Sequence, residues 1–459
     1  MKKCDGTRGV REGGVEPPAS TPGLTPGFDE RCTPLIRRGW AERLYGNSRS
    51  ARLSTAYHTT ALFSEGFILL NCDMLTRRIL LVATFALAGC APRSAVVQSG
   101  APNPGAVVLA TRKAPAAAWY DTIRPLATLS KGWNRIPGRF GTGCAHDSTF
   151  AFRVRPGLPD KVMIFLNGGG ACWRAQECDP RGRPTYTMTS DSANDASVRA
   201  GIFDVANPAN PVRDFTMVYI PYCTGDVHLG TREVEYESHD AKGATRAFAV
   251  RHGGAANVEA VLDWVYINLR SPRVVFVTGV SAGAIPSPVI AAKVARHYPR
   301  ARVVQLGDGA GGYHAATVPS LLAGWGATEY LQEDAAFRSL DSADFSFERL
   351  YVAAGRVAPR VHFAQVNTAE DATQLYFLSL LGVKGTPLAK LLATDLAEVR
   401  DGVPWFRTYT APGKVHTILR SNAVYSTTVD GVPFRDWLEG LVNGESVEDV
   451  GAKLLASKR

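Results

Sequence analysis

The sequence predicts an α/β fold with a mostly parallel central sheet flanked by helices. Short apolar runs rich in β-branched residues alternate with longer segments of helical spacing, the pattern of strand–helix–strand units. For example, a segment of helical spacing over 257–269 lies between the apolar runs 215–222 and 273–278. Apolar residues make up 45% of the 459 residues and charged residues 20%, which excludes a largely disordered chain.

The elements are expected in the following order. Strands over 149–154 and 161–166 flank a turn sequence at 155–160 and are predicted to form an opening hairpin. A strand follows at 215–222, and then a helix over 257–269 with one apolar face. The later predicted elements are a strand at 273–278, a helix at about 284–298, strands at 302–306 and 361–366, a helical region at about 375–398, a strand at 405–410 and a closing helix at 434–441.

Residues 74–90 have the layout of a secretory signal peptide. Arg77 and Arg78 precede an apolar run over 79–88, and small residues precede Cys90. The last four residues, Leu-Ala-Gly-Cys, resemble a bacterial lipobox, whose cysteine is lipidated and becomes the first residue of the mature protein. The run is too short to span a bilayer comfortably, and a buried apolar helix is the alternative interpretation.

A signal peptide must stand at the start of its protein. Residues 1–73, rich in Arg, Gly and Pro and without periodicity, are therefore interpreted as spurious upstream translation and disordered, with Met74 as the initiator. Residues 91–117 are rich in Ala, Pro and Gly and are predicted to be a flexible tether, with the folded domain over 118–459. The expected location is the bacterial cell envelope, at the outer membrane or in the periplasm, with a lipid anchor on Cys90.

The net charge of +9 does not indicate nucleic-acid binding. Lys and Arg number 51 against 42 Asp and Glu, and four of the nine excess charges precede residue 91. The remaining five are spread over the rest of the chain without a dense basic run. We therefore expect no nucleic-acid partner.

Four cysteines follow Cys90, and an even number in an exported protein suggests disulfides. Cys172 and Cys178 are close enough in sequence for a local bridge, which leaves Cys144 to pair with Cys223. A zinc site is the competing idea, but no CxxC motif or histidine cluster accompanies these cysteines in the sequence. No metal is expected.

The strongest chemical signal is the sequence Gly-Val-Ser-Ala-Gly at 279–283. A predicted strand precedes it and a predicted helix follows, which is the context of a nucleophile elbow that lifts Ser281 clear of the sheet. The flanking glycines are expected because side chains there would collide with neighbouring backbone. A tight glycine turn with an incidental serine is the alternative.

A serine hydroxyl needs a base and a residue that orients the base. In enzymes with this elbow the chain order is Ser, then Asp or Glu, then His. His416, in a loop after the last strand candidate, is the predicted base. His314 comes too early, His362 falls inside a strand, and His297 lies on the helix of the elbow itself.

The acid is expected at the end of the preceding strand. Asp371 is the predicted acid, and the side chain of the adjacent Glu370 is expected to point elsewhere. Asp308, at the end of an earlier strand, is the rival; its alternative role is to support the elbow region through backbone hydrogen bonds.

Acyl transfer also needs donors to the developing oxyanion. One is the backbone N–H of Ala282, next to the nucleophile. The other is expected from Gly168, Gly169 and Gly170, in the loop after the second predicted strand. One alternative is a phosphate-binding loop, but no Lys-Ser/Thr pair follows the glycines. The other is a flexible turn without a catalytic role.

These motifs resemble the pectin acetylesterase/Notum family of serine carboxylesterases. The resemblance is carried by Asn-Gly-Gly-Gly-Ala-Cys-Trp at 167–173, Ile-Pro-Tyr-Cys-Thr-Gly-Asp at 220–226, the elbow, Asp-Gly-Ala at 308–310, Asp-Ala-Thr-Gln at 371–374 and Val-His at 415–416. It covers roughly residues 130–440. One departure is Ala284, where many members carry a second glycine.

The resemblance implies an α/β-hydrolase core. It also implies the triad Ser281, Asp371 and His416, oxyanion donors from Gly169, Gly170 and Ala282, and the bridges Cys172–Cys178 and Cys144–Cys223. No cofactor is implied. The chain lacks the extra cysteines of animal members, so a long-acyl pocket like theirs is not assumed.

The function predicted from the sequence is hydrolysis of short-chain, chiefly acetyl, esters on polysaccharide by an exported, monomeric carboxylesterase. A lipase-like esterase for longer acyl chains is the alternative within the enzyme class. Outside that class, the alternative is a catalytically idle surface lipoprotein that binds glycan through aromatic side chains such as Trp119, Trp133 and Trp173.

Overall fold

The computed structural model describes residues 107–108, 123–146, 148–190, 200–240, 242–341 and 345–456. The predictions for residues 1–73 and 74–90, including the lipidation of Cys90, lie outside the described residues. Within the predicted tether, Val107–Val108 forms a short strand, β1. None of the helices in the described ranges combines the length and the apolar character that a bilayer-spanning helix requires.

The central sheet of the described chain has eight strands. From one edge to the other they are β11 (Phe406–Ala411), β10 (His362–Thr368), β9 (Arg302–Asp308), β8 (Val274–Val280), β4 (Leu158–Leu166), β5 (Phe215–Ile220), β3 (Ala151–Arg155) and β2 (Asn134–Pro137). The strands from β11 to β5 are parallel, whereas β3 and β2 each run antiparallel to their neighbour. The predicted α/β-hydrolase-like fold with a mostly parallel sheet is confirmed.

Residues of β4 alternate between the two faces of the sheet. Val162, Ile164 and Leu166 join the apolar core on one face, and Met163 and Phe165 join the core on the other. All five side chains are buried. Burial on both faces explains why the central strands read as continuous apolar runs rather than as an alternation of apolar and polar residues.

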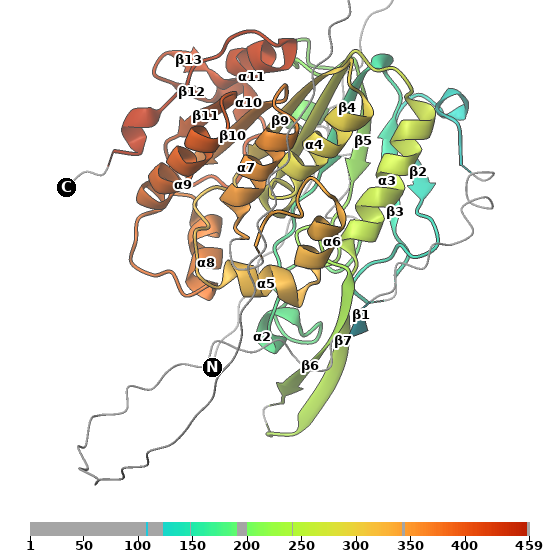
Figure 1. Cartoon of the computed structure of the whole chain (residues 1–459), viewed down its shortest axis with the longest axis vertical. Coiled ribbons are helices and arrows are strands. Elements are labelled where there is room, and N and C mark those ends of the chain that lie inside the picture. Colours follow the sequence, from blue (N-terminus) through green and yellow to red (C-terminus); the bar gives the residue numbers. More distant parts are fainter. Residues whose placement is uncertain are drawn as a thin grey trace, which may run out of the picture. The chain divides into compact units, whose positions relative to one another are not determined.

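Helices cover both faces. On one face the core takes residues from α3 (Gly254–Asn268), α4 (Ser287–His297), α7 (Phe347–Val357) and α9 (Leu388–Gly402), and on the other from α11 (Phe434–Asn443). Figure 1 shows α3, α4 and α7 side by side in front of the sheet. The shorter helices and strands are η1 (Leu126–Thr128), α2 (Ala175–Cys178), η3 (Gly201–Phe203), η4 (Ser281–Gly283), α5 (Val318–Gly324), α6 (Ala327–Glu333), α8 (Ala372–Leu380), α10 (Ala423–Ser426), β12 (Thr428–Val429), β13 (Val432–Pro433) and η6 (Ala452–Leu454).

The structure corrects two details of the predicted elements. The predicted hairpin over 149–166 is wrong, because β5 lies between β3 and β4 and hydrogen-bonds to both. The predicted helical region at 375–398 is divided into α8 and α9. Gly382 and Gly385 between them have φ of 89° and 75°, and Pro387 follows, so a continuous helix cannot form there.

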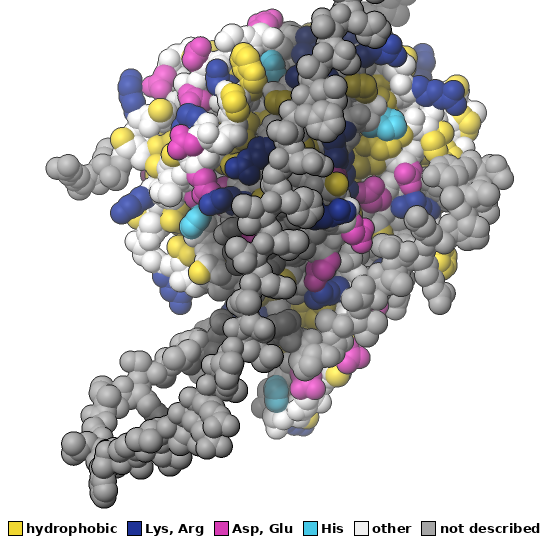
Figure 2. All heavy atoms as spheres, in the orientation of Figure 1, with side chains coloured by type: hydrophobic (Ala, Val, Ile, Leu, Met, Phe, Trp, Pro, Cys, Tyr) yellow, Lys and Arg dark blue, Asp and Glu magenta, His cyan; other side chains and the backbone are white. Residues whose placement is uncertain are grey.

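A long hairpin made of β6 (Arg232–His239) and β7 (Thr245–His252) was not predicted. It pairs with β1 in a separate three-stranded sheet and extends below the central sheet in Figure 1. Basic and acidic side chains both occur across the described part of the face shown in Figure 2.

Candidate active site

Ser281 occupies a strained turn between β8 and α4. Its φ is +53°, in the left-handed region that L residues with a side chain rarely adopt. A Cβ atom on Gly279 would collide with the carbonyl oxygen of Gly283, and one on Gly283 would collide with that of Leu166. The two glycines are therefore required for this turn, as a nucleophile elbow demands. Ser281 is partly exposed, whereas Ala282 after it is 5% exposed.

Asp371 and His416 meet at the same edge of the sheet, where β10 and β11 end. His416 Nδ1 lies 2.7 Å from Asp371 Oδ2. Asp371 is fully buried, and its Oδ1 accepts the N–H groups of Thr373 and Gln374 at 2.9 and 3.0 Å, so it is also the N-cap of α8. An ionised carboxylate only accepts, so Nδ1 carries the proton and Nε2 is left as the acceptor. The adjacent Glu370 is exposed.

Asp308, the rival acid, contacts the backbone after His416 and not the imidazole. Its Oδ2 accepts the N–H groups of Ile418 and Leu419 at 2.8 Å each. The intervening Thr417 has φ of +67°. Asp308 is 1% exposed, and burial raises its pKa to about 7 although the two N–H donors act in the opposite direction. The contacts of this carboxylate hold the loop that carries His416.

The glycine loop after β4 lies against Ser281. A Cβ atom on Gly168 would stand 2.6 Å from the carbonyl oxygen of Val280 and 2.8 Å from Ser281 Cβ, so only glycine permits this approach. Gly170 has φ of +77°. Gly169 and Gly170 follow directly along the loop, and Ala282 follows Ser281, so all three predicted donors belong to segments beside the serine hydroxyl.

The side chains of His228 and Arg420 hydrogen-bond to the first residue of this loop. The sequence had indicated no role for these two residues. His228 Nε2 lies 2.8 Å from the carbonyl oxygen of Asn167, and Arg420 Nη1 lies 2.7 Å from Asn167 Oδ1. Burial lowers the pKa of His228 to about 4, so the ring is neutral and donates its single N–H to the carbonyl.

Asp226 in turn holds His228. Its Oδ1 accepts the hydroxyl of Thr224 at 2.6 Å and the N–H of His228 at 3.1 Å, and its Oδ2 accepts the N–H of Gly254 at 2.7 Å. Burial raises the pKa of Asp226 to about 6. Asp226 is the last residue of the motif at 220–226. The motif therefore included one residue of this network, but the sequence did not show which groups it contacts.

A pocket that is partly open to solvent has Ser281 in its wall. Most of its lining is apolar and includes large aromatic side chains. The lining residues are Gly170, Ala171, Trp173, Val227, Ser281, Ala282, Ile285, Tyr313, Leu321, Trp325, Phe347, Phe377 and Leu381. A concave apolar pocket beside a nucleophile is the usual form of an acyl-binding site.

The pectinacetylesterase family model matches residues 140–322 of the chain. The chain is similar to the pectinacetylesterase family. This finding confirms the resemblance predicted from the motifs. The palmitoleoyl-protein carboxylesterase NOTUM of Schmidtea mediterranea is 30% identical over 101 residues, a stretch that covers 21% of this chain and 19% of that relative. The match thus spans about a fifth of the curated relative.

The pectinacetylesterase-like region contains the glycine loop and the elbow and ends before Asp371 and His416. Both disulfides implied by the resemblance are present, Cys144–Cys223 and Cys172–Cys178. Cys223 follows β5 closely and Cys172 follows the glycine loop, so each bridge fastens a segment next to the site.

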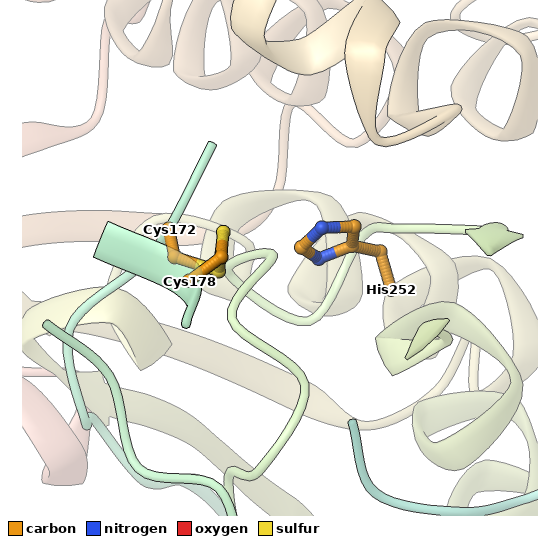
Figure 3. A group of neighbouring side chains, drawn as sticks. All are labelled: Cys172, Cys178 and His252. Atoms are coloured by element: carbon orange, nitrogen blue, oxygen red, sulfur yellow. A yellow bond between two sulfur atoms is a disulfide. The ribbon is translucent and has the colours of Figure 1, made fainter. Parts of the chain in front are cut away.

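His252 lies beside Cys172 and Cys178, and Figure 3 shows the imidazole directed toward the sulfur atoms. The sulfurs form a disulfide and are not thiolates, so they do not offer metal ligands in this state. The imidazole nitrogens of His252 face the carbonyl of Thr224 and the hydroxyl of Tyr236, each at 2.9 Å. The group is a structural junction between the disulfide and the hairpin of β6 and β7.

The other candidate residues lie away from Ser281 or in supporting positions. His362 stacks on Trp405 and His297 on Tyr266, with ring centroids 5.4 and 3.7 Å apart. Trp173 lines the pocket, whereas Trp133 packs edge-on against Phe203. Trp119 lies outside the described residues, and Ala284 is buried behind the elbow.

Proposed function

We propose that the chain is an exported serine carboxylesterase that hydrolyses acetyl esters on polysaccharide. The observation that carries the proposal is the contact between His416 Nδ1 and Asp371 Oδ2 at the sheet edge where Ser281 stands in its strained turn. The match to the pectinacetylesterase family supports ester hydrolysis and an acetyl group as the acyl part. The similarity to a palmitoleoyl-protein carboxylesterase supports the same reaction class.

In the proposed reaction Ser281 Oγ attacks the ester carbonyl carbon, and His416 Nε2 takes the hydroxyl proton. Asp371 stabilises the imidazolium and keeps the proton of Nδ1 in place. His416 then gives its proton to the leaving alcohol, which departs and leaves an acyl group on Ser281. A water molecule, deprotonated by the same imidazole, hydrolyses the acyl-serine and restores the free hydroxyl.

The oxyanion that forms in each half of this reaction needs N–H donors that are already in position. We assign this role to Gly169, Gly170 and Ala282. The bond from His228 to the carbonyl of Asn167 supports the assignment because it restrains the start of the glycine loop. Donors that are held in place avoid the free energy of reorganising a flexible loop during the reaction.

A second candidate is an esterase for longer acyl chains, and the pocket favours it. The aromatic lining offers an apolar surface that a longer acyl chain would bury. Each buried methylene contributes about 0.8 kcal/mol. The pocket wall therefore predicts measurable activity on medium-chain esters even if acetyl esters are the natural substrate.

The test compares the purified protein, produced in an oxidising compartment, with its Ser281→Ala variant. We expect the variant to lose p-nitrophenyl acetate hydrolysis by about 10³-fold or more and to lose labelling by a fluorophosphonate probe. Replacing the exposed Ser320 by Ala is the control and should change neither readout. Full activity of a folded Ser281→Ala variant would exclude the mechanism.

Comparison of acetate with octanoate then separates the candidates. A higher kcat/KM on acetate supports the deacetylase, and a higher value on octanoate supports the second candidate. If neither ester is hydrolysed and the probe does not label Ser281, the chain is instead a binding protein.

We also propose that the protein is lipid-anchored in the bacterial envelope through Cys90. In a bacterial host, the wild type should enter the membrane fraction and incorporate a labelled fatty acid, whereas Cys90→Ser should do neither. Recovery of a mature protein that retains Met1 would contradict this proposal and the assignment of Met74 as the initiator.

A further inference from the structure

We propose that His314, Glu348 and Asp395 form a binding site for a divalent transition-metal ion. The three residues come from different elements: His314 from the segment between β9 and α5, Glu348 from the first turn of α7, and Asp395 from the middle of α9. One nitrogen or carboxylate oxygen of each lies within 4.8 Å of the others. An ion with ligand distances of about 2.0–2.3 Å can bridge donors at such separations with small side-chain movements.

The two carboxylates lack the partners that buried carboxylates normally have. Asp395 is 1% exposed and Glu348 is 2% exposed. Within the described part of the chain, both carboxylate oxygens of Asp395 and Oε2 of Glu348 lack a hydrogen bond of normal geometry; the groups that approach Asp395 are the carboxyl group of Glu348 and the N–H of Gly312. Buried charges are almost always paired or bound to a metal, because an isolated one costs several kcal/mol of desolvation. A cation bound among these oxygens would supply the positive charge that they need when ionised.

The neighbouring Arg349 does not neutralise these two carboxylates. Arg349 Nε lies 2.6 Å from Glu398 Oε1, on the outer side of the group. The other oxygen of Glu398 lies 3.9 Å from His314 Nδ1. Glu398 therefore adds negative charge at the rim of the site and stands where it can orient the imidazole, as carboxylates beside metal-bound histidines commonly do.

The exposed side chain of His314 gives the ion a route from solvent. The side chain of His314 is 59% exposed, whereas the two carboxylates are buried beneath it. An imidazole ligand also selects the class of ion, because calcium and magnesium prefer oxygen donors, whereas manganese and zinc accept a histidine nitrogen with carboxylates. The site joins α7 to α9, so we expect its occupation to stabilise the fold.

A shared proton is the competing explanation for the two carboxylates. Burial, followed by the charge of Glu348, raises the pKa of Asp395 well above its usual range, while the nearby N–H of Gly312 acts in the opposite direction. A proton between the two carboxyl groups would satisfy one oxygen of each. It would not involve His314, so the two explanations make different predictions for His314.

The test uses the full-length protein and Mn²⁺, followed by the electron paramagnetic resonance signal of the free ion. Manganese is preferred to zinc because Cys4, Cys32, Cys72 and Cys90 lie outside the described residues and thiolates bind zinc. We expect one saturable site in the wild type, at least tenfold weaker in Asp395→Asn and in His314→Ala. His239→Ala, which removes an exposed histidine of the hairpin, is the matched control and should bind like the wild type.

Thermal unfolding provides a second readout that does not depend on esterase activity. Mn²⁺ should raise the Tm of the wild type and of His239→Ala, and leave that of Asp395→Asn unchanged. If Asp395→Asn fails to fold, the Mn²⁺ affinity of His314→Ala still tests the proposal, because the His314 side chain is exposed and its loss should not unfold the protein. The proposal is overturned if the wild type shows no saturable binding, or if neither variant weakens it. Binding of Ca²⁺ as tight as that of Mn²⁺ would overturn the transition-metal assignment.

Discussion

Asp308 Oδ2 lies 2.8 Å from the backbone nitrogen of Ile418, two residues beyond His416. The same oxygen accepts the N–H of Leu419. One buried carboxylate at the end of β9 thus holds the return of the chain after the proposed base, while a different carboxylate, Asp371, contacts the imidazole. Asp308 thus restrains the backbone after His416, and Asp371 orients its imidazole ring.

Replacing Asp308 by Asn should change how stability depends on pH. The pKa of Asp308 is about 7 in the folded protein, above its ordinary value of 3.8. The folded state therefore binds more protons between these two values, so the contribution of this group to stability is complete below about pH 4 and is lost as pH rises through 7. The Asn side chain keeps an acceptor oxygen and does not titrate.

We therefore expect Asp308→Asn to gain stability relative to the wild type between pH 5 and pH 8, on the order of 1 kcal/mol or more. Urea unfolding at the two pH values measures this difference. Asp214→Asn, at an exposed aspartate, is the control and should track the wild type. An equal stability difference at both pH values would show that Asp308 does not titrate in this range.

Replacing Asp371 by Asn should abolish most activity without unfolding α8. Asn is as good an N-cap as Asp, so the bonds to Thr373 and Gln374 can persist. Its amide nitrogen, however, can donate to Nδ1 of His416 and stabilise the tautomer whose Nε2 is protonated and cannot act as a base. We expect kcat on p-nitrophenyl acetate to fall by about 10³–10⁴-fold.

The companion variant Asp371→Ala should show a similar loss of kcat. It should also lose about 1 kcal/mol of unfolding free energy, because the cap is removed. Retention of kcat within tenfold of the wild type in Asp371→Asn would remove Asp371 from the proposed triad.

Replacing His228 by Asn should reduce kcat by disturbing the glycine loop. His228 has φ of +63°, a conformation that Asn tolerates, but Asn cannot reach the carbonyl of Asn167 as the Nε2–H of His228 does. We expect kcat to fall by about 10–100-fold with a smaller change in KM, since a small displacement of oxyanion donors affects the transition state most.

The loss should be the same from pH 6 to pH 9, because burial lowers the pKa of His228 to about 4 and the ring stays neutral throughout. His239→Ala serves as the control for loss of a histidine. A loss of activity that changes steeply with pH in this range would mean that His228 takes part in proton transfer.

Strand positions were predictable from sequence because burial on both faces makes the central strands continuous apolar runs. The order in which the strands pair could not be predicted from the sequence. The runs at 149–154 and 161–166 are close in the chain, and nothing in their composition shows that β5 inserts between them. The hairpin of β6 and β7 was missed although Val234 and Tyr236 alternate with acidic residues, which is the pattern of a strand with one buried face.

Within the proposed site, motif and chain order selected Ser281, His416 and two candidate acids. Which of Asp371 and Asp308 contacts the imidazole needed coordinates, because both lie where parallel strands end and only the direction of the side chain separates them. The role of His228 was hidden for a similar reason. Its partner Asn167 is 61 residues away in the sequence and meets it only through the fold.

Placing a polar side chain in the pocket should separate long from short acyl substrates. Phe377 on α8 lines the pocket, whereas the adjacent Tyr376 is 49% exposed. We expect Phe377→Asn to lower kcat/KM on p-nitrophenyl octanoate by about tenfold, because a long chain would then lie against an amide that it cannot satisfy. An acetyl group has only one methyl group to bury, so activity on p-nitrophenyl acetate should change by less than about twofold. Tyr376→Asn, one residue away on the same helix, should leave both substrates unaffected. An equal loss on both esters in Phe377→Asn would show that this wall supports the glycine loop and does not bind the acyl chain.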